Sequence, residues 1–397
     1  MTAPANRPYD VVLFGATGFT GGLVAEYLAR ASTRESFRWA VAGRSPEKLD
    51  EVRRRIAAIA PEAKVGSLIA DVDDRDALAA MAGSTAVLIT TVGPYLRYGN
   101  DVLAACVEAG THYVDLTGEP GFVDRSRKLY DDIARQRGLR IVHCCGFDSI
   151  PHDLGALFAV DALRERIGED AFNEADITVR GFVEASGTFS GGTWNSAIEQ
   201  FSRGRQYLKE RPKLDRDAVR TVRGERARLY YDRALRRWAC PLPTIDPQVV
   251  LQSARLRADY GATFRYGHYL LSDHLLPIIG GAVGIGTVMA LAQFKPTADL
   301  LRKVRQGGEG PSAEKRAASW FRVLFIAGDG KHEVTCEVSG GDPGYDETAK
   351  MLAESALAIA LDADLPPHCG VVTPAAGIGH TLIRRLQVAG IRFSVVR

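Results

Sequence analysis

Residues 10–22 read DVVLFGATGFTGG, an apolar run that breaks at Gly15 into a glycine-rich loop and continues as the helix-forming stretch LVAEYLARA. This order of strand, G-x-x-G-x-x-G loop and helix is typical of the start of a nucleotide-binding βαβ unit. Gly15 allows a tight turn, Gly18 lets the backbone approach a pyrophosphate, and Gly21 allows close packing of helix and strand. The loop therefore predicts dinucleotide binding, with the phosphates held by N–H groups at the helix start.

Short apolar segments alternate with stretches of helical periodicity along the first 150 residues. The apolar segments are VVLF, WAVAGR, VGSLIADV, TAVLITTVG, HYVDLTG and LRIVHCCGF. Strands buried on both faces of a sheet need no polar alternation, so this rhythm predicts a doubly wound parallel sheet. The stretches between them carry apolar residues three and four positions apart, as helices packed on a sheet do. We therefore expect an α/β fold with a Rossmann-type nucleotide-binding domain over residues 1–150.

The composition changes after Pro151, which indicates a second domain. EADITVRGFVEA, WFRVLFIAG and HEVTCEVSG predict strands of a mixed or antiparallel sheet, and the charged run from Lys209 to Arg237 predicts a solvated loop and helix face. Residues 151–344 are thus expected to form an α+β domain for substrate binding or dimerisation. The tail, residues 345–397, predicts two helices and a last strand, and we expect its helix from Glu347 to Ala360 to pack back on the first domain.

One segment departs from the globular pattern. Residues 275–294 read LLPIIGGAVGIGTVMALAQF, carry no charge, and have about the length of a bilayer-spanning helix. Three interpretations stay open: a helix buried in the core or at a homodimer interface, a wall of an acyl-chain pocket, and a direct membrane contact. A single spanning helix is the least favoured, because globular sequence resumes on both sides.

Composition excludes several classes of protein. With 46% hydrophobic residues, 25% charged residues and a formal net charge of +2, the chain has the balance of a globular protein and no basic field for nucleic acid. Its six cysteines form no C-x-x-C pair, and no H-x-x-x-H spacing occurs, so no metal site and no disulfide framework are predicted. The N-terminal MTAPANRPYD lacks the order of a secretory signal. We expect a cytoplasmic protein with reduced cysteines and, through residues 275–294, a peripheral membrane contact as an option.

The end of the second predicted strand decides between the nicotinamide cofactors, since a carboxylate there binds ribose hydroxyls and an arginine binds a 2′-phosphate. Here Arg44 and Ser45 follow the strand, which favours NADP (NADPH), although an exposed loop arginine of no function has the same sequence. Lys48 is within reach of the same phosphate, and Asp71 either meets the adenine or caps a turn. The predicted cofactor-binding residues are Gly15, Ala16, Thr17, Gly18, Phe19, Thr20, Gly21, Arg44, Ser45, Lys48, Asp71, Thr91, Val92, Gly93 and Pro94.

Candidate catalytic groups follow the later strands, near the nicotinamide half of the cofactor. They are Tyr95, Asp148 and Ser149, each with a structural alternative: a tyrosine packed in its loop, and a helix N-terminus capped by Asp148 or Ser149 ahead of Pro151. The polar residues His112, Asp115, Thr117 and Glu119 call for the same caution. No Tyr-x-x-x-Lys dyad follows the fourth strand, which argues against a short-chain dehydrogenase mechanism.

Taken together, these motifs resemble a known family. VLFGATGFTG, AGRSPEKL, VGPY, HYVDLTGE, GFDSIPHDLG, GEGPS, SGGDPGYDETAKMLAESAL and VVTPAAGIGHTLIRRL resemble the saccharopine dehydrogenase-like oxidoreductases, and most of all their trans-acting enoyl reductase branch. The resemblance touches nearly the whole chain. It assigns Gly15, Gly18, Gly21 and Arg44 to the cofactor and places Tyr95 and the turn from Asp148 to Pro151 at the site. His152 stands where the family is expected to carry a small polar residue.

The resemblance implies an NADPH-dependent reductase that saturates an enoyl intermediate carried by a polyketide synthase, in lipid biosynthesis. An acyl or polyketide substrate bound to a carrier is then the expected partner. Two alternatives stay open: a saccharopine dehydrogenase-like reductase of an amino-acid-derived substrate, for which Arg180, Arg203 and Arg205 are candidate carboxylate ligands, and a non-catalytic NADP-binding scaffold on a lipid or synthase surface.

Overall fold

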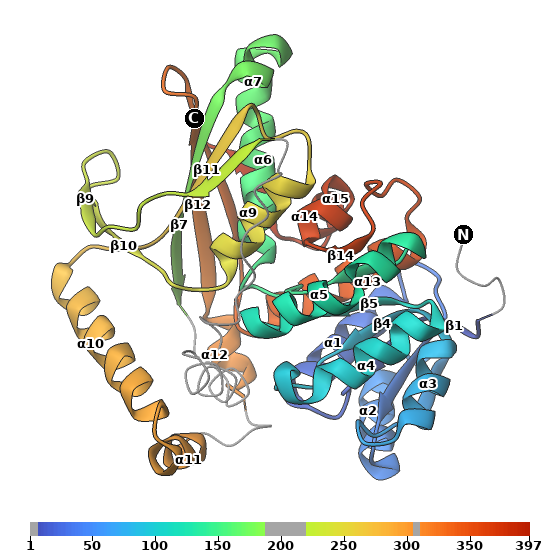
Figure 1. The fold of residues 1–397 in the computed structure, drawn as a ribbon. Coiled ribbons are helices and arrows are strands. Elements are labelled where there is room, and N and C mark those ends of the chain that lie inside the picture. Colours follow the sequence, from blue (N-terminus) through green and yellow to red (C-terminus); the bar gives the residue numbers. More distant parts are fainter. Residues whose placement is uncertain (1–6, 187–219, 305–309) are drawn as a thin grey trace. The chain divides into compact units, whose positions relative to one another are not determined.

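The computed structural model describes residues 7–186, 220–304 and 310–397, and the chain forms two compact units (Figure 1). The first unit comprises Met1–Phe147, Gly308–Gly310 and Gly344–Ala389, and the second comprises Asp148–Gly307, Pro311–Pro343 and Gly390–Arg397. The chain thus passes between the units more than once. The boundary at 147/148 lies close to the expected one, whereas the end of the tail belongs to the second unit instead of the first.

The first unit contains a seven-stranded sheet in which every pairing is parallel. Its elements are β1 (Tyr9–Phe14), α1 (Phe19–Ala31), β2 (Trp39–Gly43), α2 (Pro46–Ile59), β3 (Val65–Ile69), α3 (Arg75–Gly83), β4 (Thr85–Thr90), α4 (Tyr95–Ala109), β5 (His112–Asp115), α5 (Pro120–Gln136), β6 (Arg140–Val142), α13 (Asp346–Leu361), β14 (Gly370–Val372), α14 (Pro374–Gly377) and α15 (His380–Val388). The strand order is β14-β6-β5-β4-β1-β2-β3. The predicted doubly wound Rossmann-type sheet is confirmed.

Helices cover both faces of this sheet, with α1, α2 and α13 on one side and α3, α4 and α5 on the other. The central strands are almost wholly apolar and buried, as strands covered on both faces must be. From the tail, α13 lies against α1 and against β1, β4 and β5. Its Met351, Leu352 and Leu357 are fully buried. The sequence analysis missed β14, because its three residues are too few to give a strand signal.

Burial of His112 at the start of β5 makes the stability of this unit depend on pH. Its Nδ1 accepts the backbone N–H of Arg140 at 2.9 Å. Burial, together with the positive charges of Arg140 and Arg7, lowers the pKa of His112 from 6.5 to about 4. Between these values the unfolded chain binds a proton that the folded chain does not, so the stability contributed by neutral His112 is lost as the pH falls.

We expect His112→Asn, which keeps a hydrogen-bond acceptor and does not titrate, to remove this pH dependence. The wild-type protein should lose about 3 kcal/mol of unfolding free energy relative to the variant between pH 7 and pH 4. Urea denaturation of both proteins across that range measures the difference. Parallel pH profiles for the two proteins would contradict the assignment.

The second unit is built on a mixed sheet. Its elements are α6 (Ile150–Ile167), α7 (Glu169–Glu174), β7 (Asp176–Ser186), β8 (Thr221–Gly224), β9 (Tyr230–Asp232), β10 (Arg237–Pro241), α9 (Asp246–Leu256), β11 (Thr263–Ser272), α10 (Leu275–Ala292), α11 (Lys295–Val304), α12 (Ala313–Ala317), β12 (Trp320–Gly328), β13 (Glu333–Gly340) and β15 (Arg392–Val395). The order is β15-β13-β12-β7-β11-β10-β9, with β8 also paired to β11.

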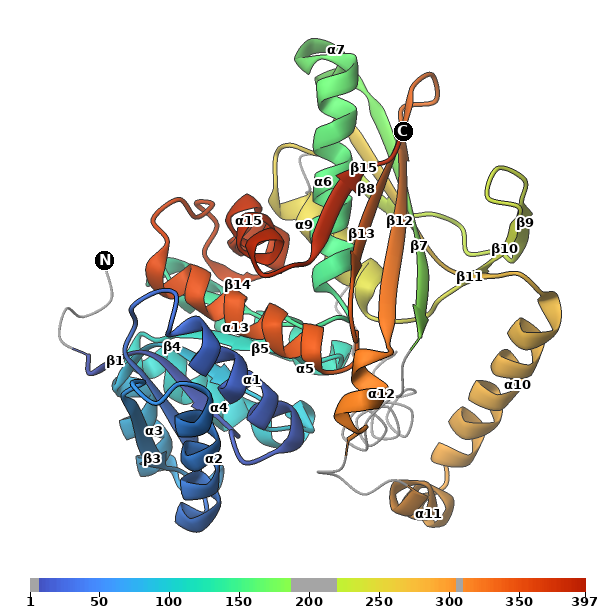
Figure 2. The same cartoon turned by 180° about the vertical axis from the view of Figure 1, so that it is seen from behind.

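Helices α6 and α9 pack against this sheet (Figure 2). The β7–β11 and β8–β11 pairings are parallel, whereas the pairings of β12, β13 and β15 are antiparallel, as predicted for a mixed sheet. The expectation of a helix face in the charged run from Lys209 to Arg237 is wrong for residues 220–237, which form β8, β9 and the start of β10. Residues 209–219 lie outside the described part of the chain.

Helix α10 contains nearly all of the uncharged segment, residues 275–294. Apart from its contacts with α11 and β11, it projects away from the other elements of the second unit in both views (Figures 1 and 2). Leu276 is 79% exposed, Val283 64% and Phe294 66%, while Ile278 is one of the few buried side chains. A Cβ built on Gly280, Gly281, Gly284 or Gly286 would meet nothing within 4 Å. The interpretation of this segment as a helix buried in the core of its own chain is therefore wrong.

Candidate functional site

The glycine loop between β1 and α1 is held by backbone hydrogen bonds. Gly15 has a φ of +91°, which L side chains rarely adopt, and its N–H donates to the carbonyl of Ala42 at 3.0 Å. Helix α1 begins at Phe19, and its N-cap, Gly18, makes no side-chain capping bond; the N-terminus of a helix favours an anion. Ala16 is buried, whereas Thr17, Phe19 and Thr20 are only half-buried. The loop has the geometry of a phosphate-binding turn.

Gly21 lies where helix and loop come closest. A Cβ at this position would lie 2.1 Å from the carbonyl oxygen of Gly15 and 2.8 Å from Oγ1 of Thr91. The Thr91 hydroxyl itself donates to the Gly15 carbonyl at 3.2 Å. The third glycine of the motif is thus required by packing, and Thr91 joins the end of β4 to the glycine loop.

At the end of β2, Arg44 is exposed, and its guanidinium makes no ion pair or hydrogen bond with any other residue that the structure describes. Ser45 is the N-cap of α2: its Oγ accepts the N–H of Lys48 at 3.3 Å and donates to Glu47 at 2.8 Å. Asp71, after β3, accepts the N–H of Asp73 at 3.3 Å. Arg44 is therefore the group at this edge best able to bind a phosphate.

The loop Thr91–Pro94 ends β4 and leads into α4. Val92 donates its N–H to Oγ1 of Thr90 at 3.2 Å, and the peptide bond between Gly93 and Pro94 is cis. The loop is anchored by Glu119, whose two carboxylate oxygens accept the N–H groups of Tyr95 at 3.0 Å and Leu96 at 2.9 Å. This anchoring role was missed from the sequence, since a carboxylate 24 positions away gives no local capping signal.

The phenol of Tyr95 is buried and donates to the carbonyl of Thr90 at 3.1 Å. Burial, together with the negative charge of Asp115, raises the pKa of Tyr95 well above its ordinary value. A phenol in this state is a poor proton donor, so its contacts fit the alternative of a tyrosine packed in its loop. Asp115 is itself fully buried and accepts hydrogen bonds from Tyr113 at 2.9 Å and from the backbone N–H of Thr117 at 3.0 Å.

Asp148 and Ser149 stand at the start of α6, in the second unit. The Ser149 hydroxyl donates to the carbonyl of Asp148 at 2.7 Å and makes no capping bond to the helix, contrary to the capping interpretation. Desolvation by the surrounding protein, and next the negative charge of Asp246, raises the pKa of Asp148, but the residue is exposed, so solvent screens this effect. Of the three predicted catalytic residues, Asp148 is the one that offers an exposed carboxyl group.

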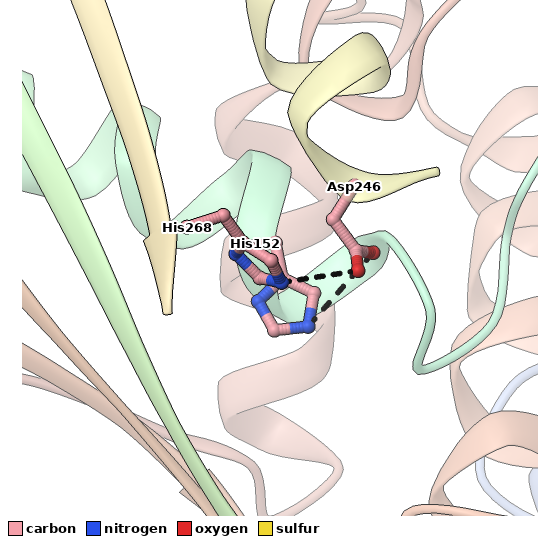
Figure 3. A group of neighbouring side chains, drawn as sticks. All are labelled: His152, Asp246 and His268. Carbon is pink, nitrogen blue, oxygen red and sulfur yellow. Dashed lines mark ion pairs between the residues drawn. The ribbon is translucent and has the colours of Figure 1, made fainter. Parts of the chain in front are cut away.

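The second unit also contains a buried polar cluster that the sequence analysis did not identify. Figure 3 shows His152 from the first turn of α6, Asp246 from the start of α9 and His268 from β11, all pointing toward one another. His152 Nε2 lies 3.9 Å from Asp246 Oδ1, and His268 Nε2 lies 3.3 Å from Asp246 Oδ2. No spacing rule links positions 152, 246 and 268, so only the fold brings them together.

Burial and the neighbouring polar groups have opposite effects on the pKa values of this cluster. Burial lowers the pKa of His152 to about 4 against the attraction of Asp246. Burial acts to raise the pKa of Asp246, but its interactions with His152, His268 and Thr244 outweigh burial, and the net direction is downward. Thr244 donates a hydrogen bond to Asp246 Oδ2. The cluster therefore holds an ionised carboxylate between two imidazoles inside the protein.

Comparisons with known proteins agree with this fold and with a nucleotide-binding first unit. The saccharopine dehydrogenase NADP-binding domain matches residues 11–138. A trans-acting enoyl reductase of Mycobacterium ulcerans is 34% identical, over 99% of this chain and 99% of its own length. The Mycobacterium tuberculosis protein Rv2449c, provisionally named a trans-acting enoyl reductase, is 38% identical over 100% of this chain and 99% of its own.

Among solved structures, apo saccharopine dehydrogenase (L-Glu forming) from Saccharomyces cerevisiae has a TM-score of 0.56 and 13% identity. The match covers 98% of this chain and 100% of that one. At this identity the likeness shows a shared fold over both units. It does not show a shared substrate.

Proposed function

Because the chain belongs to the trans-acting enoyl reductase branch of the saccharopine dehydrogenase-like oxidoreductases, we propose that it uses NADPH to saturate the C=C bond of an enoyl thioester. The same relatives and the matching NADP-binding domain establish that the chain is an NADP-dependent oxidoreductase. The proposal that the substrate is an enoyl thioester rests on the 34–38% identity with these enoyl reductases over their full length. In the reaction a hydride from NADPH adds to the β-carbon, a proton adds to the α-carbon, and NADP⁺ leaves.

The residues at the carboxyl edge of the parallel sheet fit this cofactor. The α1 N-terminus offers N–H groups to the pyrophosphate, and Arg44 offers an unpaired guanidinium to the 2′-phosphate. Thr91, Val92, Gly93 and Pro94 would border the nicotinamide half. We propose all the loop residues from Gly15 to Gly21, with Arg44, as the cofactor contacts, and Ser45, Lys48 and Asp71 as their neighbours.

Arg44→Ala is expected to weaken NADPH binding about 10- to 100-fold while leaving NADH binding nearly unchanged, because a charge-assisted hydrogen bond to phosphate is worth about 1.5–3 kcal/mol. Titration of the intrinsic fluorescence with each cofactor measures both constants. Arg54→Ala, on the exposed side of α2, is the matched control and should change neither. Equal losses for NADPH and NADH would contradict the assignment of the 2′-phosphate to Arg44.

We propose Asp148 as the proton donor to the α-carbon, since it is an exposed carboxyl group in the segment between β6 and α6, after the carboxyl end of a strand of the parallel sheet. Activity should fall as the pH rises through the raised pKa of this carboxyl group, because the acid form is lost. Asp148→Asn should lower kcat strongly at pH 6.5, remove this alkaline limb, and leave NADPH affinity within a factor of two, by order of magnitude. Asp132→Asn, an exposed acid on α5, is the control. An unchanged pH profile in Asp148→Asn would refute the assignment.

An acyl substrate is favoured over an amino-acid-derived one. Arg180, the described member of the three arginines considered as carboxylate ligands, is bound by Glu225 through contacts of 2.6 and 2.9 Å. Its charge is therefore already compensated. Arg203 and Arg205 lie outside the described residues. The exposed apolar helix α10 instead suits a lipid-like partner.

We infer that α10 contacts a lipid surface. Among the described residues, α10 is the one helix that is long and apolar enough to cross a membrane. It has 18 residues, and only 13% of it is buried. A helix that is apolar on all sides requires either a protein core or lipid around it, and the described residues of its own chain do not supply the core. The following helix, α11, has the net basic sequence KPTADLLRKV, which suits anionic headgroups. A second copy of this chain and a synthase surface remain the competing occupants.

The proposed reaction is tested by following NADPH oxidation with a synthetic long-chain 2-enoyl thioester. With NADPH deuterated at the transferred position, mass spectrometry should find one deuterium on the β-carbon of the saturated product. Turnover of an amino-acid-derived imine in place of the thioester would favour the saccharopine dehydrogenase-like alternative. Tight NADPH binding without oxidation of either substrate would favour a non-catalytic scaffold.

A further inference from the structure

The cluster of His152, Asp246 and His268 stands apart from the nucleotide loop, in the second unit. The side chains are 2%, 3% and 1% exposed, in that order, and one ligand atom from each lies within 4.8 Å of the other two. The three residues come from α6, α9 and β11, and α9 packs against both α6 and β11 in this unit. The fold thus holds two nitrogen donors and one carboxylate at a single buried point.

Two buried polar atoms in this cluster have no hydrogen-bond partner among the described residues. Asp246 Oδ1 and His268 Nε2 are buried, and neither has a hydrogen-bond partner among the described residues, even though His268 Nε2 is close to the carboxylate. Buried polar atoms of this kind are rare in native proteins, because each costs free energy unless something satisfies it. A group bound between the two atoms would satisfy both.

Neighbouring residues hold the donor atoms in place. The Nδ1 of His268 lies 3.2 Å from the hydroxyl of Tyr266, which orients the ring so that Nε2 faces the cluster. Thr244 donates to Asp246 Oδ2. The two imidazoles meet edge to face, with ring centroids 4.8 Å apart. An outer hydrogen bond that orients an imidazole is the usual support of a histidine that binds a metal ion.

We propose that His152, Asp246 and His268 bind one divalent transition-metal ion of the zinc class. Bond lengths of about 2.0–2.2 Å place neighbouring ligand atoms of a tetrahedral site about 3.3–3.5 Å apart. Here one ligand atom from each residue lies within 4.8 Å of the other two, with His152 Nε2 3.9 Å from Asp246 Oδ1 and His268 Nε2 3.3 Å from Asp246 Oδ2, so a small adjustment of the side chains would close the site around an ion. Two imidazoles and one carboxylate are a usual ligand set for such an ion, and a fourth position is left for water. The ion also compensates the buried negative charge of Asp246.

The site links the first turn of α6 to α9 and β11, so the bound ion would stabilise the second unit. The inference does not depend on the reductase activity. Zn²⁺ itself is the probe for the test. Full-length protein without a histidine tag is stripped with a chelator and titrated with Zn²⁺ by calorimetry, and we expect one ion per chain and a higher melting temperature. Asp246→Asn and His268→Gln should each weaken binding at least 100-fold and abolish the shift in melting temperature.

His332→Ala is the matched control, since His332 pairs with Asp329 at 3.1 Å on the surface and should not affect the stoichiometry. Cobalt(II) then separates this site from the cysteines of the chain. Intense visible bands without a thiolate charge-transfer band support the histidine and carboxylate ligand set, and this spectrum of the wild-type protein needs no variant to fold. A thiolate band, stoichiometric binding that survives both substitutions, or no tight binding of Zn²⁺ would each overturn the proposal.

Discussion

Gly21→Ala is expected to abolish NADPH binding and to destabilise the first unit by about 3 kcal/mol or more. The added Cβ would lie 2.1 Å from the carbonyl oxygen of Gly15, and a backbone atom cannot move aside as a flexible side chain can. Helix α1 would have to shift away from the loop, which moves its N–H groups out of register with the pyrophosphate. Calorimetric titration with NADPH and thermal unfolding measure the two effects.

Two other glycines make this prediction specific. Gly18→Ala places a Cβ 3.4 Å from the Gly15 carbonyl, so the protein should fold normally while the methyl group obstructs the approach of the phosphates. Gly83→Ala, at the end of α3, meets nothing within 4 Å and should leave both stability and NADPH affinity unchanged or improved. Should Gly21→Ala bind NADPH as tightly as Gly83→Ala does, the close packing of loop and helix would have no bearing on the cofactor.

The double variant Leu276→Asp/Val283→Asp is expected to lower vesicle binding by at least two orders of magnitude. Both side chains are more than half exposed on α10, and an aspartate costs about 3 kcal/mol at a lipid-buried position. Co-sedimentation with vesicles of phosphatidylcholine and phosphatidylglycerol measures the binding. NADPH affinity should not change, because the glycine loop and Arg44 belong to the other unit.

A second double variant, Val388→Asp/Val396→Asp, adds the same charges at apolar residues that are 83% and 56% exposed elsewhere, and it should bind vesicles as the wild type does. Three results count against a lipid surface. If the wild-type protein does not bind vesicles but forms a dimer that the α10 substitutions dissociate, α10 contacts a second copy of the chain. Unchanged vesicle binding with lost turnover of long enoyl thioesters would assign it to the acyl pocket. Loss of binding in both double variants would point to net charge alone.

The sequence was most informative where chemistry is local. The G-x-x-G-x-x-G loop, the apolar strands and the helices between them lie within a few residues of one another, so periodicity and turn chemistry predicted the parallel sheet. The strand β14 was missed because it has only three residues and pairs with residues of β6 that lie 230 positions away, as in the pairing of Val372 with Val142. The described part of the charged run forms β8, β9 and the start of β10 instead of a helix, because pairing with β11 and β10 overrides local propensity there.

The same distinction between local signals and long-range contacts applies to the site residues. The exposed position of Arg44 could be predicted because it directly follows β2, whereas the anchoring of Tyr95 by Glu119 and the meeting of His152, Asp246 and His268 require the tertiary fold. The unusual character of residues 275–294 was evident from composition. The exposure of this segment could not be predicted, because composition alone does not distinguish an apolar helix buried in a core from one that faces outward.

The late helix α13 has a consequence for biosynthesis. Residues 344–389 complete the nucleotide-binding unit, so α1, β1, β4 and β5 have no cover from α13 while the chain is still being made. At about 5–20 residues per second the ribosome needs on the order of ten seconds or more to pass from residue 147 to residue 389. During that time the half-built sheet presents apolar surface to the cytosol and to chaperones, and premature termination anywhere in the second unit yields a nascent chain that cannot close its first domain.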